Sequence, residues 1–302
     1  MRIGLTGGGA DIDRLIAAAQ QAEADGFTSI WYPSAVARDP LTAMALVGRA
    51  TSEIELGTAV LQTYTSHPAL MANRAMAAAE AMGRSGFTLG IGPSHEPVIE
   101  GMYGLSFEHP GRHMEEYVAV LAPMLRGEAV SFEGDEYRVH LPASTPPAQP
   151  VQLMLGALAP RYLRIAGQQS AGTILWMGNA RAIEGHVAPR LRQATGDGAE
   201  PRIVAGLPVV VHDDIDEARN EAAKQFAVYG TLPNYLRLMA HGGIQGPAEA
   251  AIVGNEAAVR GQLQALFDAG ATDIWAAPFS VGTDRKASRD RTMALLRELV
   301  AS

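Results

Sequence analysis

Two short segments of the sequence carry residues suited to binding and chemistry. The first follows an apolar run and reads Gly92-Pro93-Ser94-His95. Glycine lets a ligand approach the backbone closely, and a histidine can donate a hydrogen bond or a proton near neutral pH. We therefore take His95 as a candidate catalytic residue. A structural histidine near the start of the next helix is the alternative interpretation.

The second segment predicts an anion site. Gly156-Ala157-Leu158-Ala159 is followed by Pro160 and by a helix that carries Arg161 and Arg164. Free N–H groups and the dipole at a helix start attract anions such as phosphate. A neighbouring run ends in Trp176-Met177-Gly178-Asn179, which would place a large wall beside that anion. The alternative is a pair of tight turns with solvated arginines.

All three tryptophans fall at or near the ends of short apolar runs: Trp31, Trp176 and Trp275. In a barrel, large residues at such strand ends can plug the top layer of the interior. They can also form the wall of a pocket for a flat ring. The residue types alone leave both interpretations open.

Several other chemistries lack the residues they need. The chain has no cysteine, which excludes disulfides, cysteine nucleophiles, thiolate zinc sites and cysteine-ligated iron–sulfur clusters. Neither a His-Glu-x-x-His nor a Gly-x-Ser-x-Gly motif is present. His109 and His113 are four residues apart, but Pro110 and Gly111 lie between them. We predict no metal site.

The carboxylates of the chain allow one further enzyme class, a barrel glycosidase. Glu96 together with Asp213 or Asp214 has the residue types of a glycosidase acid and nucleophile. Capping of the following helix by Asp213, Asp214 and Asp216 is the simpler interpretation.

The elements that position these residues follow a recurring pattern, in which a helix-like stretch ends at glycine and a short β-branched or aromatic run follows. The four clearest cases begin at Gly26, Gly86, Gly172 and Gly270. Glycine just past a helix end takes the left-handed conformation readily, and the short run suits a buried parallel strand. The repeated pattern predicts βα units.

Helix starts and the number of strands complete the fold prediction. Asp11, Asp39-Pro40 and His67-Pro68 are predicted helix starts. Together with runs at 2–6, 55–61, 151–155 and 203–211, the pattern gives eight strands. Because no Gly-x-Gly-x-x-Gly turn follows the first strand, we expect a (β/α)8 TIM barrel and not an open dinucleotide-binding sheet.

We expect a single domain over residues 1–302, with two short insertions. Residues 129–140 read as a β-hairpin turning at Gly134-Asp135, and residues 230–253 are rich in glycine and proline. The net charge of −8 shows no block of like charges, so no nucleic-acid binding is expected. The chain has neither a signal-peptide pattern nor a long apolar run, so we expect a cytoplasmic protein without membrane contact.

At these strand ends the sequence resembles the luciferase-like monooxygenase superfamily, and within it the branch that uses the deazaflavin coenzyme F420. The resemblance runs over essentially the whole chain. Its most telling stretches are Met1-Arg2-Ile3-Gly4-Leu5-Thr6-Gly7-Gly8, Leu56-Gly57-Thr58-Ala59-Val60, Leu89-Gly90-Ile91-Gly92-Pro93-Ser94-His95, Gly111-Arg112-His113-Met114-Glu115-Glu116-Tyr117 and Ile252-Val253-Gly254.

The resemblance implies a bulge at the end of the third strand, often with a non-proline cis peptide, that backs the middle ring of the cofactor. In this sequence that feature maps to Ala59-Val60, with Thr58 adjacent; taken alone, the segment reads as an ordinary buried strand. The resemblance also puts Gly92 to His95 beside the ring and the phosphate-bearing tail at the turn after the fifth strand. It further implies a homodimer.

Two departures narrow the implied activity. F420-dependent glucose-6-phosphate dehydrogenases carry a catalytic histidine just after the second strand, where this chain has Trp31-Tyr32-Pro33-Ser34-Ala35-Val36, so sugar dehydrogenation is not expected. Light-emitting luciferases also have a histidine there and a reactive cysteine near the flavin. This chain has neither, so bioluminescence is not expected.

Together these observations predict an F420-dependent oxidoreductase that moves hydride between the deazaflavin and a small, moderately apolar organic substrate. His95 or Ser34 would supply a proton, and Trp31, Met177 and Phe279 would contribute pocket walls. The expected cofactor-binding residues are Gly7, Trp31, Thr58, Ala59, Val60, Gly92, Pro93, Ser94, His95, Gly156, Ala157, Leu158, Ala159, Arg161, Trp176 and Met177. The alternatives are an FMN-dependent monooxygenase on the same fold, a protein that only sequesters the cofactor, and the barrel glycosidase.

Overall fold

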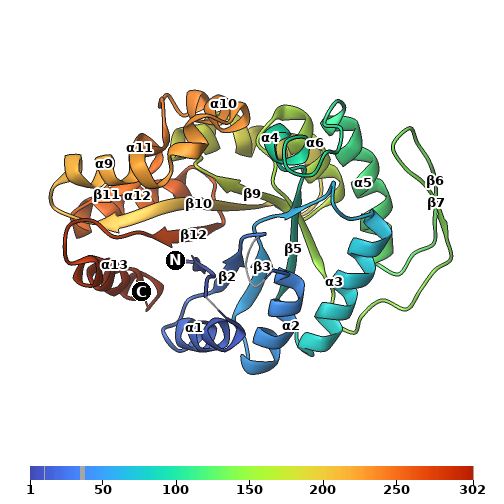
Figure 1. The fold of residues 1–302 in the computed structure, drawn as a ribbon, viewed down its shortest axis with the longest axis horizontal. Coiled ribbons are helices and arrows are strands. Elements are labelled where there is room, and N and C mark those ends of the chain that lie inside the picture. The colour runs from blue at the N-terminus through green and yellow to red at the C-terminus, as the bar shows by residue number, and fades with distance from the viewer. Residues whose placement is uncertain (10, 35–37, 302) are drawn as a thin grey trace.

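The computed structural model describes residues 1–9, 11–34 and 38–301. Its centre is a closed barrel of eight parallel strands, in which the last strand pairs back onto the first (Figure 1). These strands are β1 (Ile3–Thr6), β2 (Ser29–Tyr32), β3 (Glu55–Thr58), β5 (Phe87–Gly92), β8 (Gln152–Leu155), β9 (Gly172–Trp176), β10 (Arg202–Val211) and β12 (Asp273–Pro278). The predicted (β/α)8 barrel is thus confirmed.

Helices surround the barrel and connect successive strands. The longer ones are α1 (Ile12–Ala24), α2 (Pro40–Ala50), α3 (Pro68–Met82), α5 (Pro110–Leu125), α6 (Pro160–Gln169), α8 (Ala188–Thr195), α9 (Ile215–Gln225), α10 (Pro233–His241), α12 (Glu256–Asp268) and α13 (Arg285–Ala301). Short segments complete the set: α4 (Glu96–Ile99), α7 (Ala180–Ala182), a π-helix (Ile183–Val187), a 3-10 turn (Ala227–Gly230) and α11 (Pro247–Ala250).

The glycine signal behind the fold prediction has the expected geometry. Gly26, Gly86, Gly172 and Gly270 all have positive φ, at 86°, 91°, 145° and 108°. A side chain would be strained in that conformation, so glycine lets the chain turn from helix into strand.

The predicted helix starts are only partly capped as expected. Asp11 caps α1, because its carboxylate accepts the Arg14 N–H at 2.8 Å. His67 accepts the Ala69 N–H at the start of α3. At the start of α2 Asp39 and Pro40 take the predicted N-cap and first-turn positions, but the Asp39 carboxylate makes no cap hydrogen bond and binds the Thr42 hydroxyl and the Arg74 guanidinium.

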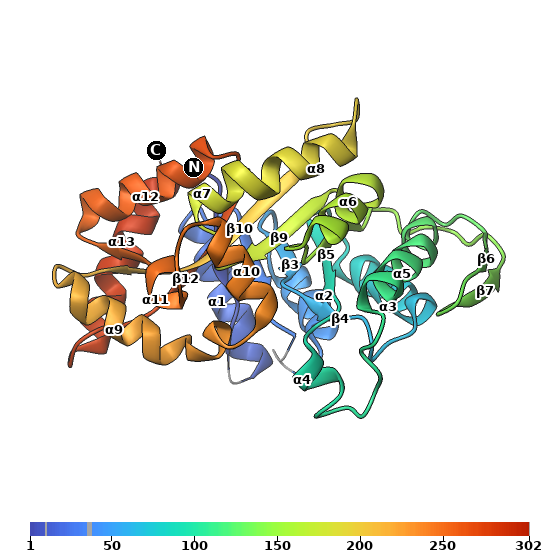
Figure 2. The same cartoon turned by 90° about the horizontal axis from the view of Figure 1, so that it is seen from above.

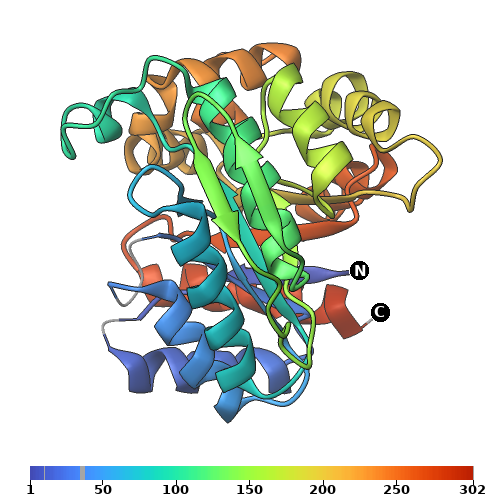
Figure 3. The same ribbon diagram turned by 90° about the vertical axis from the view of Figure 1, so that its right-hand side faces the viewer.

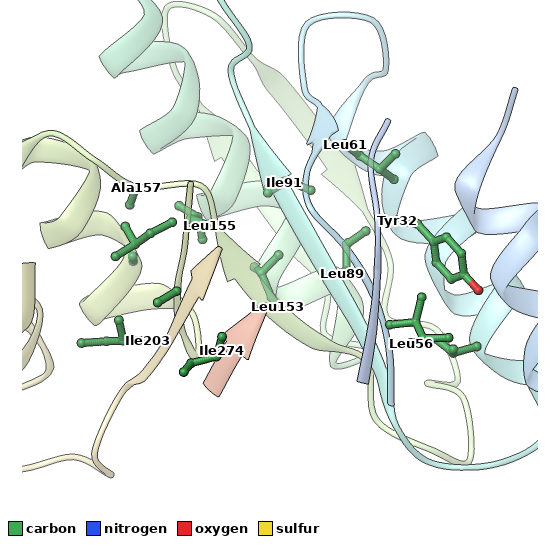
Figure 4. Packing of buried hydrophobic residues seen from close by; sticks show 14 of the residues in the cluster. Tyr32, Leu56, Leu61, Leu89, Ile91, Leu153, Leu155, Ala157, Ile203 and Ile274 are labelled. Atoms are coloured by element: carbon green, nitrogen blue, oxygen red, sulfur yellow. The ribbon is translucent and has the colours of Figure 1, made fainter. Parts of the chain in front are cut away.

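Side chains alternate between the barrel interior and the surrounding helices. Trp31, Met154, Ile174, Val204 and Trp275 form a buried cluster of their own. The larger apolar cluster packs between the sheet and the helices. Figure 4 shows part of it, including Tyr32, Leu56, Leu89, Leu153 and Ile203. Neighbouring residues Trp31 and Tyr32 belong to different clusters, as the period of two along a strand requires.

A charged network occupies the amino-terminal base of the barrel. The Arg202 guanidinium lies 2.9 Å from Glu55 and 2.8 Å from Asp273, and Arg2 adds a second contact to Asp273 at 2.9 Å. Burial alone would raise the pKa of Asp273. The hydrogen bonds and positive charge of Arg202 outweigh burial and lower that pKa. Every ion in this network therefore has an opposite partner.

The two segments predicted as insertions differ in structure. The first forms the predicted antiparallel hairpin, β6 (Val130–Glu133) with β7 (Arg138–Leu141). It lies alongside α5 at one end of the molecule (Figures 2 and 3). The Glu116 carboxylate on α5 accepts the N–H groups of Asp135, Glu136 and Tyr137 and holds its turn.

The second insertion is more ordered than its glycine- and proline-rich composition suggested. It contains α10, α11 and the short strand β11 (Ile252–Gly254), which extends the sheet beyond β10. Helices α9, α10 and α11 gather on one side of the barrel, where the ten-residue strand β10 ends (Figure 1). None of the helices in the described ranges is long and apolar enough to cross a membrane.

Candidate functional site

A cavity of about 320 Å³ opens at the carboxyl ends of the barrel strands. That end carries the active site in barrel enzymes. Segments from around the barrel contribute its lining: Thr6, Pro33, Ala59, Val60, Gly92, Pro93, Ser94, His95, Gly156, Leu158, Ala159, Tyr162, Ile174, Leu175, Trp176, Phe226, Tyr229, Asn234, Tyr235, Trp275 and Ala277.

One wall of the cavity is made of backbone and small side chains. The peptide bond between Ala59 and Val60 is cis, as the resemblance implied. This peptide interrupts the pairing with β5. Strand β3 ends at Thr58, and the pairing resumes at the two-residue strand β4 (Leu61–Gln62). The predicted bulge is therefore present, and the alternative of one uninterrupted strand over 55–61 is wrong.

Two glycines lie beside this bulge, and no side chain projects from them into the cavity. A Cβ added to Gly92 would lie 2.9 Å from Val60 Cγ2, and one added to Gly156 would lie 3.3 Å from the same atom. Behind the wall, the buried Thr58 hydroxyl donates to the Gly90 carbonyl at 2.7 Å and accepts the Gly90 N–H at 2.8 Å. The result is a fixed surface that a planar ring can approach.

The facing wall is aromatic and comes mainly from the α9–α10 region. Trp176 packs edge-on against Phe226 and Tyr229, with ring centroids 6.1 and 5.7 Å apart. Tyr229 in turn packs edge-on against Tyr235 at 5.1 Å. Burial raises the pKa of Tyr235, so its hydroxyl stays protonated at neutral pH.

His95 lies where the two walls meet. Its ring is 5.5 Å from that of Tyr235, and burial lowers its pKa, so the imidazole is neutral at pH 7. It sits at the N-cap position of α4 without capping the helix through its side chain. Among the described residues neither ring nitrogen has a hydrogen-bond partner, which leaves both available to a ligand.

The cavity lining has no formal charge at neutral pH within the part of the chain that the structure describes. It contains no Asp, Glu, Lys or Arg. Its polar side-chain groups are hydroxyls, the indole N–H groups of Trp176 and Trp275, the Asn234 amide and the neutral imidazole of His95. An uncharged bound group therefore meets no uncompensated ion here.

The predicted anion turn lies at the cavity edge, and no side chain caps the helix that follows it. Ala159 occupies the N-cap position of α6 and offers no side-chain cap. Because Pro160 has no N–H, the free donors at this helix start, among the described residues, are the N–H groups of Arg161 and Tyr162. The preceding turn is anchored, because the Ala157 N–H donates to the Thr173 hydroxyl at 3.2 Å. Arg161 and Arg164 are exposed and share one carboxylate, Glu115, at 2.6 and 3.1 Å.

Several predicted site residues do not line the cavity. Trp31, Thr58, Ala157 and Met177 are buried behind it. The Trp31 indole donates to the Ser29 hydroxyl inside the barrel, which favours the interior-plug interpretation for this tryptophan. Trp176 and Trp275, in contrast, line the cavity.

Other predicted residues lie at its margins or elsewhere. Ser34 is half-buried next to Pro33, which lines the cavity, whereas Ala35 and Val36 lie outside the described residues. Gly7 lines a separate hollow between β1, α1 and α13. Phe279 is not a pocket wall, because it packs behind Phe226 in a cluster with Val210.

Four of the lining residues that sequence reasoning missed share one cause. Phe226, Tyr229, Asn234 and Tyr235 do not follow a barrel strand, so no strand-end rule points to them. Their one signal was a cluster of aromatic residues within 226–235, next to a segment that otherwise read as turns. Tyr162 lies in the first turn of α6 between Arg161 and Arg164, and the sequence analysis considered only those two arginines.

The carboxylates considered for a glycosidase are engaged elsewhere. Asp213 forms a two-bond ion pair with Arg291, and Asp214 caps α9 by accepting the Glu217 N–H at 2.9 Å. Glu96 starts α4 and does not line the cavity. The capping interpretation is therefore confirmed for Asp214 alone, and the cavity lining in the described part of the chain contains no carboxylate.

Comparison with known proteins adds a second line of evidence. The family model for luciferase-like monooxygenases matches residues 2–302. The chain is 30% identical over 284 residues to the F420-dependent hydroxymycolic acid dehydrogenase of Mycobacterium tuberculosis, covering 86% of this chain and 77% of that one. It is 28% identical over 269 residues to the 5,10-methylenetetrahydromethanopterin reductase of Methanolobus tindarius, covering 87% and 80%.

Among solved structures, the FMN complex of the oxygenating constituent of 3,6-diketocamphane monooxygenase from Pseudomonas putida superposes with a TM-score of 0.74. The two sequences are 16% identical, and the match covers 100% of this chain and 98% of the other. At that identity the superposition shows the same fold.

Proposed function

This chain belongs to the luciferase-like monooxygenase family, and we propose that it is an F420-dependent oxidoreductase. It transfers hydride between the deazaflavin and a small, moderately apolar organic substrate. The observation that carries this proposal is the cavity wall formed by Ala59 and Val60, with Gly92 and Gly156 beside it. The F420-dependent activities of the relatives in Mycobacterium and Methanolobus support the choice of cofactor.

The residues of the cavity fit a planar cofactor with an anionic tail. Ala59, Val60, Gly92 and Gly156 would back the ring, since a side chain at either glycine would crowd Val60. The free N–H groups at the start of α6 would bind the phosphate-bearing tail. When bound there, the deazaflavin would supply a two-electron hydride carrier.

His95 is the proposed proton-transfer residue. Its imidazole is neutral, faces the cavity and has no protein partner among the described residues, so it can hold or release a proton at the substrate. Ser34 is the second candidate, because it follows Pro33 at the cavity rim. The aromatic wall would exclude water and orient the substrate against the cofactor.

An FMN-dependent monooxygenase is the second candidate, favoured by the FMN-bound structure with the same fold. Both cofactors need a ring platform and a phosphate site, which the cavity offers equally. Titrating the purified protein with F420 and with FMN, followed by fluorescence, separates them. We expect micromolar binding of F420. Micromolar binding of FMN with no response to F420 would reverse the assignment.

The single-domain organisation, the cytoplasmic location and the homodimer expected from the sequence remain parts of this proposal. The family match over residues 2–302 supports one domain throughout. Light scattering coupled to size exclusion would test the dimer: a mass of twice 31.9 kDa is expected, and a mass of 31.9 kDa would refute it.

A further inference from the structure

A buried histidine lies behind the cavity lining, between the anion-site turn and helix α10. His186 is 2% exposed and belongs to the five-residue π-helix. Its Nε2 lies 2.8 Å from the Leu158 carbonyl oxygen, so Nε2 carries the proton and donates it. Leu158 lines the cavity on the anion-site turn. The side chain thus fixes the carbonyl of a residue in direct contact with the cavity.

The other face of this histidine contacts the aromatic wall's helix. The His241 ring, in the last turn of α10, stacks on His186 with centroids 3.8 Å apart and planes 11° from parallel. Helix α10 begins with the segment that carries Asn234 and Tyr235 into the cavity. One buried ring therefore touches both the cofactor-side turn and the helix of the opposite wall.

A second contact joins the same two elements. The Asn179 amide donates to the Gly242 carbonyl at 3.1 Å, and its oxygen caps α7 by accepting the Ala182 N–H at 3.0 Å. The end of α10 is thereby tied to the segment that leads into the π-helix. π-Helical turns are rare and recur at functional sites.

The remaining nitrogen of His186 has no partner. Its Nδ1 is buried and makes no hydrogen bond within the described ranges. If this position needed only to pack against His241, an apolar ring would suffice. If it needed only to donate to the Leu158 carbonyl, an amide would suffice. A histidine does both, since it donates to Leu158 and presents a flat face to His241.

We propose that His186, stacked on His241, is a positioning residue that holds the cofactor-side turn at Leu158 and helix α10 in register, so that the two walls of the cavity stay at a fixed separation. The part of this proposal that concerns cofactor affinity rests on the proposed function. The part that concerns the two walls does not.

Protonation should weaken this arrangement. Burial lowers the pKa of His186, and the bond to the Leu158 carbonyl opposes that shift only in part. The charged or titratable groups that face it are His241 from α10 and Arg190 from α8, and both push the pKa further down. Because the lowered pKa favours the neutral ring, acid that protonates Nδ1 places a positive charge beside these groups and loosens the contact.

Hydrogen exchange on the protein alone tests the structural half. His186→Phe keeps a ring for His241 but loses the donor to Leu158, whereas His241→Ala keeps the donor but removes the stack. Since loss of one hydrogen bond is worth up to about tenfold in an opening equilibrium, we expect about tenfold faster exchange in residues 157–163 for the first variant. For His241→Ala we expect faster exchange of that size in residues 233–241. His140→Phe, in the exposed hairpin, is the control.

Unchanged exchange in both segments would overturn the proposal. So would acceleration spread evenly over the whole barrel, because that is the signature of a merely structural residue. His186→Gln, which retains a donor but has no ring, should leave 157–163 protected as in the wild type and accelerate exchange at 233–241.

Binding of oxidised F420 tests the functional half. Because burial lowers the pKa of His186, wild-type affinity should weaken only when the pH falls below the ordinary range of histidine titration, and His186→Gln should lack this step. An identical pH profile in the two proteins would contradict the role of Nδ1. If F420 does not bind at all, the proposed function fails, while the exchange experiment still decides the positioning role.

Discussion

The two ends of the barrel handle polar groups in opposite ways. At the base, Arg202, Glu55 and Asp273 are ionised and each is matched by opposite charge. At the mouth, the lining has no ion, and His95 has no hydrogen-bond partner among the described residues. Buried charges that were left unpaired at the base would be costly, so they are neutralised there. Polar groups at the mouth remain available for a ligand.

This contrast separates stability from function along the same strands. β10 carries Arg202 at its first residue, and β12 carries Asp273 at its first residue and Trp275 and Ala277 toward the cavity. A change at the base should therefore act on folding, and a change at the mouth should act on binding or turnover.

Breaking the base network should give the largest effect. Arg202→Met leaves Glu55 and Asp273 facing each other without their main cation, and removing one partner of a buried ion pair costs about 3–5 kcal/mol. We expect that loss in urea unfolding, with an unchanged KM for the folded enzyme. Arg192→Met, which breaks an exposed pair with Glu200, should cost below about 1 kcal/mol. Equal losses in the two variants would refute the contrast.

Removing the imidazole at the mouth should come next. His95→Asn is expected to lower kcat about 100-fold, the usual contribution of one general acid or base, with little change in unfolding free energy. Because the pKa of His95 is lowered, wild-type kcat/KM should fall only when the pH drops below the ordinary range of histidine. His109→Asn, on the exposed rim of α5, is the matched control. A large loss of stability in His95→Asn would instead assign His95 to structure.

Crowding the glycine wall should have the smallest of the three effects. Gly92→Ala places a Cβ 2.9 Å from Val60 Cγ2, and overpacking of this kind costs about 1–3 kcal/mol. Because the added methyl group displaces Val60, which backs the proposed ring position, we expect F420 binding to be about tenfold weaker, measured by fluorescence titration. Gly261→Ala, on α12 with no atom within 4 Å of the added Cβ, should bind like wild type. Unaltered affinity in Gly92→Ala would place the ring elsewhere.

Sequence reasoning captured the barrel because its signals are local. Gly26 and Gly270, for example, each mark a helix end by a conformation that other residues avoid, and the strand follows at once. The strand ends then led to Gly92, His95 and Gly156, all of which line the cavity. The cis peptide at Ala59–Val60 came from the family resemblance and not from any local rule.

The aromatic wall, which sequence reasoning missed, depends on contacts between segments far apart in the sequence. Tyr235 reaches the cavity only because α10 folds back across the mouth and is held by contacts such as that between Asn179 and Gly242, 63 residues apart in sequence. The prediction that Trp31 is a cavity wall is wrong for a related reason. Which of two neighbouring strand residues faces the interior depends on register, and the interior position placed its ring below the cavity.

The placement of the aromatic wall bears on how such an enzyme diversifies. Phe226, Tyr229 and Tyr235 sit on a segment that contributes no strand to the barrel, whereas the glycine wall is part of the barrel itself. Mutations in 226–241 can accumulate without disturbing the strands that carry the fold. Substitutions there would change which substrate fits while leaving the strand-borne cofactor wall in place.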